Sequence, residues 1–261
     1  MDYSEYVEVA DSRTRTIALF HSVGMVLAAF AVGIALGLAS LYVLAAFTTI
    51  RGGGGELTPT ASAVSSVFQF VGFILAVLGY LLLREDWSLV RIRSPSLRDL
   101  GLVVGGFVGI IVLNTVSSAL ISAIGLQSAQ NGVVEMGQQH PEYFLYMIPI
   151  TLFLVGPGEE LVFRGVVQGW FRRAYGPALG IVFSSLLFGA AHYFALVGTG
   201  GEGKFVYMAV AAVLGLVLGT IYEVSENIAV PILAHGIWNA FLFIVQWYVA
   251  THDIALLLHW P

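Results

Sequence analysis

The sequence contains no cysteine and few charged residues. The absence of cysteine excludes disulfide bonds, thiol nucleophiles and cysteine-ligated zinc. Charged residues make up 10% of the 261 residues, whereas a typical soluble domain has about a quarter. Hydrophobic residues make up 58%, and the mean hydropathy is +0.88, so too little polar surface exists to coat a water-soluble globule. The composition therefore predicts an integral membrane protein.

Other absences narrow the range of functions. A net charge of −5 and the scarcity of basic clusters argue against nucleic acid as a partner. No HExxH pattern is present, which excludes the common zincin layout, and no GxSxG pattern surrounds a serine. No polar stretch is long enough to form a second, soluble domain. We therefore interpret residues 1–261 as one integral membrane domain.

Long uncharged stretches divide the chain into transmembrane segments, each of which needs about 20 helical residues. The predicted spans are 17–47, 61–83, 99–124, 143–170, 177–198, 205–222 and 228–250. The first stretch is long enough to fold as a tight hairpin of two spans, so the sequence is compatible with either seven or eight spans. Residues 1–16 do not have the pattern of a secretory signal peptide, and 254–260 are too few to cross. The expected fold class is all-α, a polytopic transmembrane helix bundle.

Lysine and arginine are distributed unequally between the two sides of this bundle. With seven spans, one side collects Arg13, Arg15, Arg84, Arg91, Arg93, Arg98, Arg172 and Arg173. The other side collects Arg51 and Lys204. Because positively charged loops stay in the cytoplasm, we expect a multi-pass protein of the cell membrane with a cytoplasmic N-terminus.

Five ionisable residues lie more than five residues from either end of a predicted span, where a charge costs about 2.5–3.5 kcal/mol on insertion scales. They are Glu159, Glu160, Arg164, His192 and His235. Glu160 and Arg164 are spaced i, i+4, so they share a helix face and are expected to pair. Glu159 points about 100° away from Glu160 and remains free for another partner. An arrangement in which both carboxylates surround the arginine stays open.

Two further helix faces carry polar groups. Phe188 and His192 are spaced i, i+4, as are His235 and Asn239. A lone histidine in a helix is commonly a hydrogen-bonding partner between helices, and this reading stays open for each. Small residues beside both histidines permit close helix approach. Placing polar groups on three membrane helices is costly unless they converge, so we expect a cavity between helices of the C-terminal half.

Such a set of groups is suited to hydrolysis in two ways. Glu159 in an apolar pocket could act as general base for a water molecule held by a histidine. The second histidine and Asn239 are donors of the type that stabilise a tetrahedral oxyanion. Alternatively, Glu159, His192 and His235 form a two-histidine, one-carboxylate set with an open position, which suits catalytic Zn²⁺.

The three motifs together resemble the signature of the CPBP family, which includes the type II CAAX prenyl endopeptidases and the bacteriocin-processing and immunity proteins. The motifs are Glu159-Glu160-x-x-x-Arg164, Phe188-x-x-x-His192 and His235-x-x-x-Asn239, in this order and without substitution. The resemblance covers residues 142–250, which would form a catalytic core, while 1–141 would supply additional transmembrane helices.

The resemblance implies an intramembrane endopeptidase and assigns roles to the residues. Glu159 would activate the attacking water, His192 would help to hold it, and His235 with Asn239 would form the oxyanion site. Glu160, Arg164 and Phe188 would support this geometry. Members of the family have been described both as metalloproteases and as glutamate-type proteases, so Zn²⁺ held by Glu159, His192 and His235 stays open beside a metal-free mechanism.

The expected partners are the lipid bilayer and a peptide or membrane-protein substrate, with no nucleic acid. Two other functions stay open: a non-catalytic scaffold or immunity protein, and a proton-coupled transporter. Counting residues from the predicted cytoplasmic ends places the three motifs at unequal depths in the membrane. We therefore expect residues 165–175 to run along the membrane interface, with a site that opens to the cytoplasm.

Overall fold

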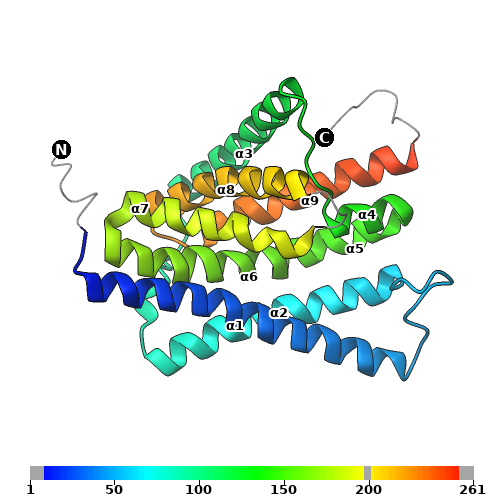
Figure 1. The fold of residues 1–261 in the computed structure, drawn as a ribbon, viewed down its shortest axis with the longest axis horizontal. Helices are drawn as coiled ribbons and strands as arrows, with labels where there is room; N and C mark the ends of the chain where they lie inside the picture. Colours follow the sequence, from blue (N-terminus) through cyan, green and yellow to red (C-terminus); the bar gives the residue numbers. More distant parts are fainter. Residues whose placement is uncertain (1–8, 197–200, 253–261) are drawn as a thin grey trace.

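The computed structural model describes residues 9–196 and 201–252, and all regular secondary structure in these two ranges is helical. Six helical runs are long and apolar enough to cross a membrane. Five of them are α1 (Ser12–Ala45), α2 (Pro59–Arg84), α3 (Leu97–Ala123), α8 (Gly201–Ser225) and α9 (Ala229–Thr251). The sixth run, Glu142–Ala195, contains 54 residues. The expected all-α polytopic bundle is confirmed (Figure 1).

The long run Glu142–Ala195 consists of several helical types joined end to end. They are α5 (Glu142–Ile150), π-helical η3 (Thr151–Val155), α6 (Gly156–Glu160), π-helical η4 (Leu161–Val167), α7 (Gln168–Ala191) and 3₁₀-helical η5 (His192–Ala195). Two short helices, η2 (Trp87–Leu89) and α4 (Gly132–Gln139), lie in the connections before and after α3. The sequence analysis did not predict α4, although asparagine, the residue type at position 131, commonly precedes a helix.

The run Glu142–Ala195 reverses its direction at Gly176. Its φ of 79° and ψ of 173° interrupt α7, and only glycine adopts such a conformation at low cost. On either side of the turn, the rings of Phe171 and Phe183 lie 5.5 Å apart. A Cβ on Gly180 would lie 2.9 Å from the backbone nitrogen of Arg172. The run is therefore two antiparallel arms, which occupy the predicted spans 143–170 and 177–198 as far as residue 196.

This hairpin corrects the expectation for residues 165–175. They continue the first arm as helix up to the turn and do not leave it to follow the membrane interface. The reason is the packing of the two arms, since Phe171 and Tyr175 both contact Phe183. The prediction failed because counting residues along the sequence does not show where the chain reverses its direction, which is at Gly176.

The first predicted span is one unbroken helix of 34 residues, α1, and not a hairpin. An eighth crossing at this position is thus excluded. Helix α1 pairs with α2 through close backbone contact, because a Cβ on Gly72 would lie 2.6 Å from the Cα of Gly33. Figure 1 shows α1 and α2 side by side along one flank of the bundle. The segment 254–260 lies outside the described residues.

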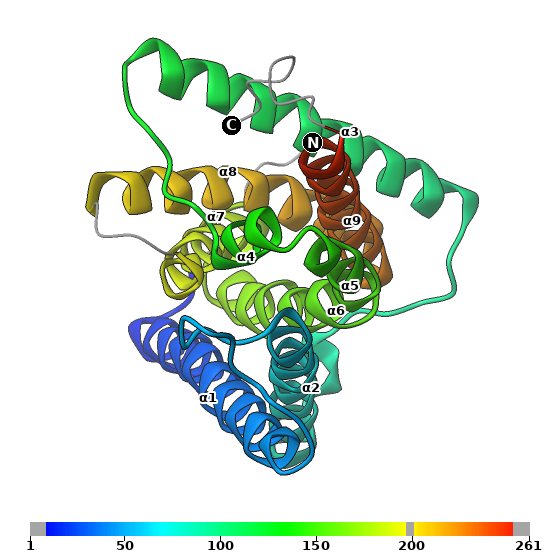
Figure 2. The same ribbon diagram turned by 90° about the vertical axis from the view of Figure 1, so that its right-hand side faces the viewer.

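On the opposite flank, α3 packs across α8 and α9 (Figure 2). Ile110 of α3, Leu218 of α8 and Trp238 of α9 are buried in one apolar cluster. Gly106 allows α3 to approach Ile221, whose side chain would lie 2.8 Å from a Cβ at this position. The hairpin arms therefore lie between two helical layers, α1–α2 on one side and α3, α8 and α9 on the other.

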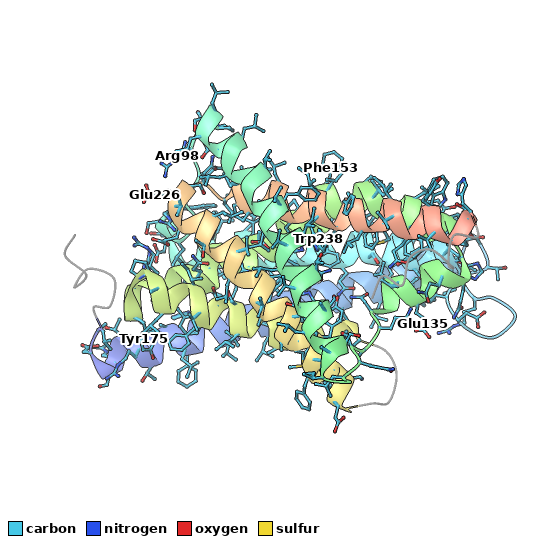
Figure 3. The ribbon with its side chains drawn as sticks, turned by 90° about the horizontal axis from the view of Figure 1, so that it is seen from above. Arg98, Glu135, Phe153, Tyr175, Glu226 and Trp238 are labelled. Atoms are coloured by element: carbon cyan, nitrogen blue, oxygen red, sulfur yellow. The ribbon has the colours of Figure 1, made fainter. Side chains whose placement is uncertain are left out.

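Charged side chains gather at the ends of the bundle. Figure 3 shows Arg98, Glu226 and Tyr175 toward one end and Glu135 toward the other. At the first end, Arg91 forms ion pairs with Glu223 at 2.8 Å and with Glu226 at 3.4 Å. Many of the arginines that set the predicted orientation therefore lie at one end of the bundle, in contact with acidic residues.

Candidate active site

The first arm of the hairpin carries adjacent glutamates in a helix of irregular width. Pro149 and Pro157 lack the N–H that a regular helix uses, and the π-helical turn Thr151–Val155 lies between them. A second π-helical turn, Leu161–Val167, follows the glutamates. Such wide turns occur frequently at functional sites. Here they flank Glu159 and Glu160 on both sides.

Glu160 and Arg164 form a fully buried ion pair. Arg164 Nε donates to Glu160 Oε2 at 3.1 Å, and both side chains have an exposed fraction of 0%. The guanidinium also lies 4.8 Å above the ring of Phe188 on the second arm. The i, i+4 spacing thus produces the expected pair. Glu159 takes no part in it, so the two carboxylates do not surround the arginine together.

His235 of α9 lies between the two carboxylates. Its Nδ1 lies 2.8 Å from Glu160 Oε1, and its Nε2 lies 3.8 Å from Glu159 Oε2. Since a carboxylate held by Arg164 accepts hydrogen bonds, Nδ1 carries the proton and donates it to Glu160. The Nε2 atom of the neutral ring is then an acceptor. It becomes a donor only when the ring is protonated.

His192 lies where α7 passes into η5, on the second arm. Its Nδ1 lies 2.8 Å from the backbone oxygen of Phe188. Because a carbonyl oxygen only accepts hydrogen bonds, Nδ1 carries the proton and Nε2 keeps a free lone pair. The ring of Phe188 lies 4.5 Å from that of His192 and 5.9 Å from that of His235. Phe188 therefore separates the two imidazoles and contacts both.

The turn at Gly176 explains why the first two motifs meet. Glu159 precedes it by about as many residues as His192 follows it, so antiparallel arms place the two at the same level. The third motif comes from α9, which begins beside the hairpin rather than at its tip. His235 therefore reaches Glu159 and Glu160, although its helix begins only a few residues earlier.

Asn239 lies one turn after His235 on α9 and is half-buried. No hydrogen bond of its side chain is present in the part of the chain that the structure describes. Glu159 is also half-buried, with 16% of its side chain exposed. The predicted residues of the three motifs are therefore brought to one region, with Glu160, Arg164 and His235 buried and Glu159, His192 and Asn239 partly accessible.

Sequence patterns did not identify two residues: Tyr207, which lies beside His192, and Asn131, which contacts Tyr207. The ring of Tyr207 in α8 lies 6.0 Å from the His192 ring, at an angle of 31°. Its hydroxyl accepts a hydrogen bond from Asn131 Nδ2 at 3.4 Å. Tyr207 stands near the start of a long apolar helix, where tyrosine is common. The sequence therefore carried no signal that would have identified it.

The side chains of the three motifs do not form a ligand set for a metal ion. Within residues 9–196 and 201–252, no three histidine, aspartate or glutamate side chains lie close enough together to hold a metal ion. Glu160 is already bound by Arg164 and by His235. His192 does not join Glu159 and His235 in a common ligand set. These side chains as arranged do not fit Zn²⁺.

The comparison with protein families gives a match in the C-terminal part of the chain. Residues 141–241 match the family model described as type II CAAX prenyl endopeptidase Rce1-like. This range contains all three motifs, the hairpin folded at Gly176, α8 and the first half of α9. No curated protein and no solved structure matches the chain.

Proposed function

We propose, from the match of residues 141–241 to the type II CAAX prenyl endopeptidase Rce1-like family, that this chain is a membrane-embedded protease with the following reaction and catalytic residues. The protein cleaves a peptide bond in a peptide or a membrane-associated protein. Glu159 acts as general base on the attacking water. The observation that carries this proposal is the position of the Glu159 carboxylate, 3.8 Å from His235 and outside the buried pair of Glu160 with Arg164.

The attacking water binds between Glu159 and His192. Glu159 has no arginine partner, so its carboxylate is available to accept a proton from water. His192 offers Nε2 as a second acceptor, because its Nδ1 proton is fixed by the carbonyl of Phe188. The water oxygen attacks the peptide carbonyl carbon while Glu159 takes one proton. Glu159 then returns this proton to the amine nitrogen as the carbon–nitrogen bond breaks, and a carboxylate and an amine are released.

The tetrahedral intermediate carries a negative oxygen that needs hydrogen-bond donors. Asn239 supplies a side-chain amide from the turn that follows His235. His235 supplies Nε2–H when its ring is protonated, since its Nδ1–H is already donated to Glu160. In this state the charges of Glu159, Glu160, Arg164 and His235 sum to zero. Glu160 and Arg164 are thus positioning residues that hold His235.

The proposed setting is the cell membrane, with the N-terminus in the cytoplasm. The arginine-rich end of the bundle, which includes Arg91, Arg93 and Arg98, supports this orientation. The partners that we propose are the lipid bilayer and a peptide or protein substrate within reach of it.

The reaction is tested with purified protein in detergent and a library of quenched fluorescent peptides, with and without a farnesylated cysteine. We expect cleavage by the wild type and none by Glu159→Ala. The matched control is Glu142→Gln, because Glu142 is exposed at the start of the first arm, and it should cleave as the wild type does. Cleavage that survives Glu159→Ala would refute the mechanism. A wild type that cleaves no peptide would instead favour the non-catalytic alternative.

The same sample separates the metal-free from the metal-dependent chemistry. Treatment with a chelator, followed by addition of Zn²⁺, should leave the cleavage rate unchanged if water is activated by Glu159 alone. Loss of activity with the chelator and its recovery with Zn²⁺ would instead require Glu159, His192 and His235 to come together as ligands.

A further inference from the structure

The second turn of α8 places a tyrosine beside the site. Residues Tyr207, Ala211, Gly215 and Gly219 follow one another at four-residue steps and share one helix face. A Cβ on Gly215 would lie 3.2 Å from both Arg164 Nη2 and Phe188 Cδ1, so this face lies directly on the polar groups of the hairpin. Tyr207 is the one large polar side chain of these four.

Close approach of α7 and α8 delivers this tyrosine to His192. A Cβ on Gly189, one turn before His192, would lie 2.8 Å from the Cβ of Ala212 in α8. Because glycine permits this contact, the Tyr207 ring comes within 6.0 Å of the His192 ring. Tyr207 therefore stands next to His192, one of the two groups that we propose to hold the water.

The connection between α3 and α4 fixes the hydroxyl of Tyr207. This segment, 124–131, passes across helices α7 and α8 on its way to α4 (Figure 2). Ala129 N donates to Gly203 O at 2.9 Å, and Asn131 forms an isolated antiparallel bridge with Leu196. Each contact comes from a backbone group. Asn131 is thereby held at a defined position over the start of α8.

Asn131 serves two partners with its side chain. Its Oδ1 accepts from Val133 N at 2.9 Å and begins α4, while its Nδ2 donates to the Tyr207 hydroxyl. The Tyr207 oxygen is thus an acceptor toward Asn131. Its own proton is donated to no group among the residues that the structure describes. A hydroxyl proton of this kind is available to a ligand.

We propose that Tyr207 is a further catalytic residue, whose hydroxyl donates a hydrogen bond to the carbonyl oxygen of the scissile peptide bond as it becomes an oxyanion. The inference rests on the proposed function. The Tyr207 hydroxyl is a donor whatever the protonation state of His235, whose Nε2 is an acceptor in the neutral ring. Asn131 is a positioning residue, since it orients the phenol and does not contact the substrate.

The test compares Tyr207→Phe with Asn131→Asp, using the peptide that the library experiment selects. Tyr207→Phe keeps the ring and removes the hydroxyl, and the loss of one oxyanion donor typically lowers kcat about 100-fold. Asn131→Asp keeps the oxygen that begins α4, but its carboxylate accepts the Tyr207 proton. We expect both variants to lose kcat with little change in KM or in the unfolding temperature. Tyr248→Phe, on the exposed face of α9, should keep the kcat of the wild type.

Three outcomes overturn the inference. One is a Tyr207→Phe variant with the kcat of the wild type, measured with a preparation in which Glu159→Ala is inactive. Another is a loss confined to KM, which would assign the hydroxyl to substrate binding alone. A third is a fall in kcat that follows the fraction of unfolded protein. Activity that survives Glu159→Ala is a separate result, because it removes the proposed function and this inference together.

Discussion

The α1–α2 pair and the hairpin folded at Gly176 are both antiparallel helix pairs, but different forces hold them together. In the α1–α2 pair the buried polar side chains are Ser22 and Ser40. Its contact is one of shape, since Gly33 and Gly72 let the two backbones meet. The hairpin instead buries an ion pair, Glu160 with Arg164. Close packing of two helices needs only small residues at the contact, whereas a buried charge needs a partner of opposite charge.

This contrast separates structural from chemical roles in the molecule. Close packing between membrane helices is favourable because small residues let the two backbones approach each other. A charged side chain, in contrast, is costly to place in the lipid interior. The hairpin therefore keeps charged groups only because Glu160, Arg164 and His235 compensate one another. The α1–α2 pair carries no such constraint at its Gly33–Gly72 contact. Variants in the two regions should accordingly differ in size of effect and in what they do to activity.

The largest effect is expected from Arg164→Met. The change leaves the Glu160 carboxylate buried without its cation, and breaking such a pair typically costs about 3–5 kcal/mol. We expect the free energy of unfolding in detergent to fall by this amount, measured by denaturant titration. Cleavage should be lost as well, because Glu160 would no longer hold His235 in place.

The matched variant for this prediction removes both charges. Glu160→Gln combined with Arg164→Met should unfold less easily than Arg164→Met alone, because no uncompensated charge remains. It should nevertheless stay inactive. A single Arg164→Met protein as stable as the wild type would contradict the comparison between the two regions.

An intermediate effect is expected from Gly72→Ala in α2. The new Cβ would lie 2.6 Å from the Cα of Gly33, so the two helices must separate. Overpacking of this kind costs about 1–3 kcal/mol. The unfolding temperature should fall, whereas the cleavage rate per folded molecule should not change.

Gly79→Ala is the matched control within the same helix. A Cβ on Gly79 meets no atom within 4 Å, so this variant should be at least as stable as the wild type. Equal destabilisation by the two substitutions would show that the close contact at Gly72 does not hold the pair together.

Much of the architecture follows from hydropathy, because a membrane helix must be apolar over its whole length. The predicted spans agree with the helices to within a few residues at α2, α3 and α9. Hydropathy carries no information on the direction of the chain, however. The hairpin at Gly176 depends on one glycine conformation, and the segment 165–175 was accordingly placed along the interface in error.

The site could be predicted only where its residues share a helix. The pairing of Glu160 with Arg164 follows from their spacing, as do the shared faces of the other two motifs. The contact of His235 with Glu160 and the position of Tyr207 depend on how separate helices pack. The bond from Asn131 to Tyr207 joins residues 76 positions apart, which no local pattern encodes.

The smallest effect is expected where the two regions are joined, at Asp86 and Arg173. Asp86 follows α2, and Arg173 lies just before the turn at Gly176; their side chains form an ion pair at 2.5 Å. The Arg173 guanidinium lowers the pKa of Asp86 from 3.8 to about 2. The stabilisation is therefore complete above the ordinary value and is lost as the pH falls toward about 2. Because the pair is partly exposed, Asp86→Asn should cost about 0.2–1 kcal/mol at neutral pH. Unfolding temperatures of the two proteins should converge across this acidic range, and a constant difference would show that the ion pair does not join the regions.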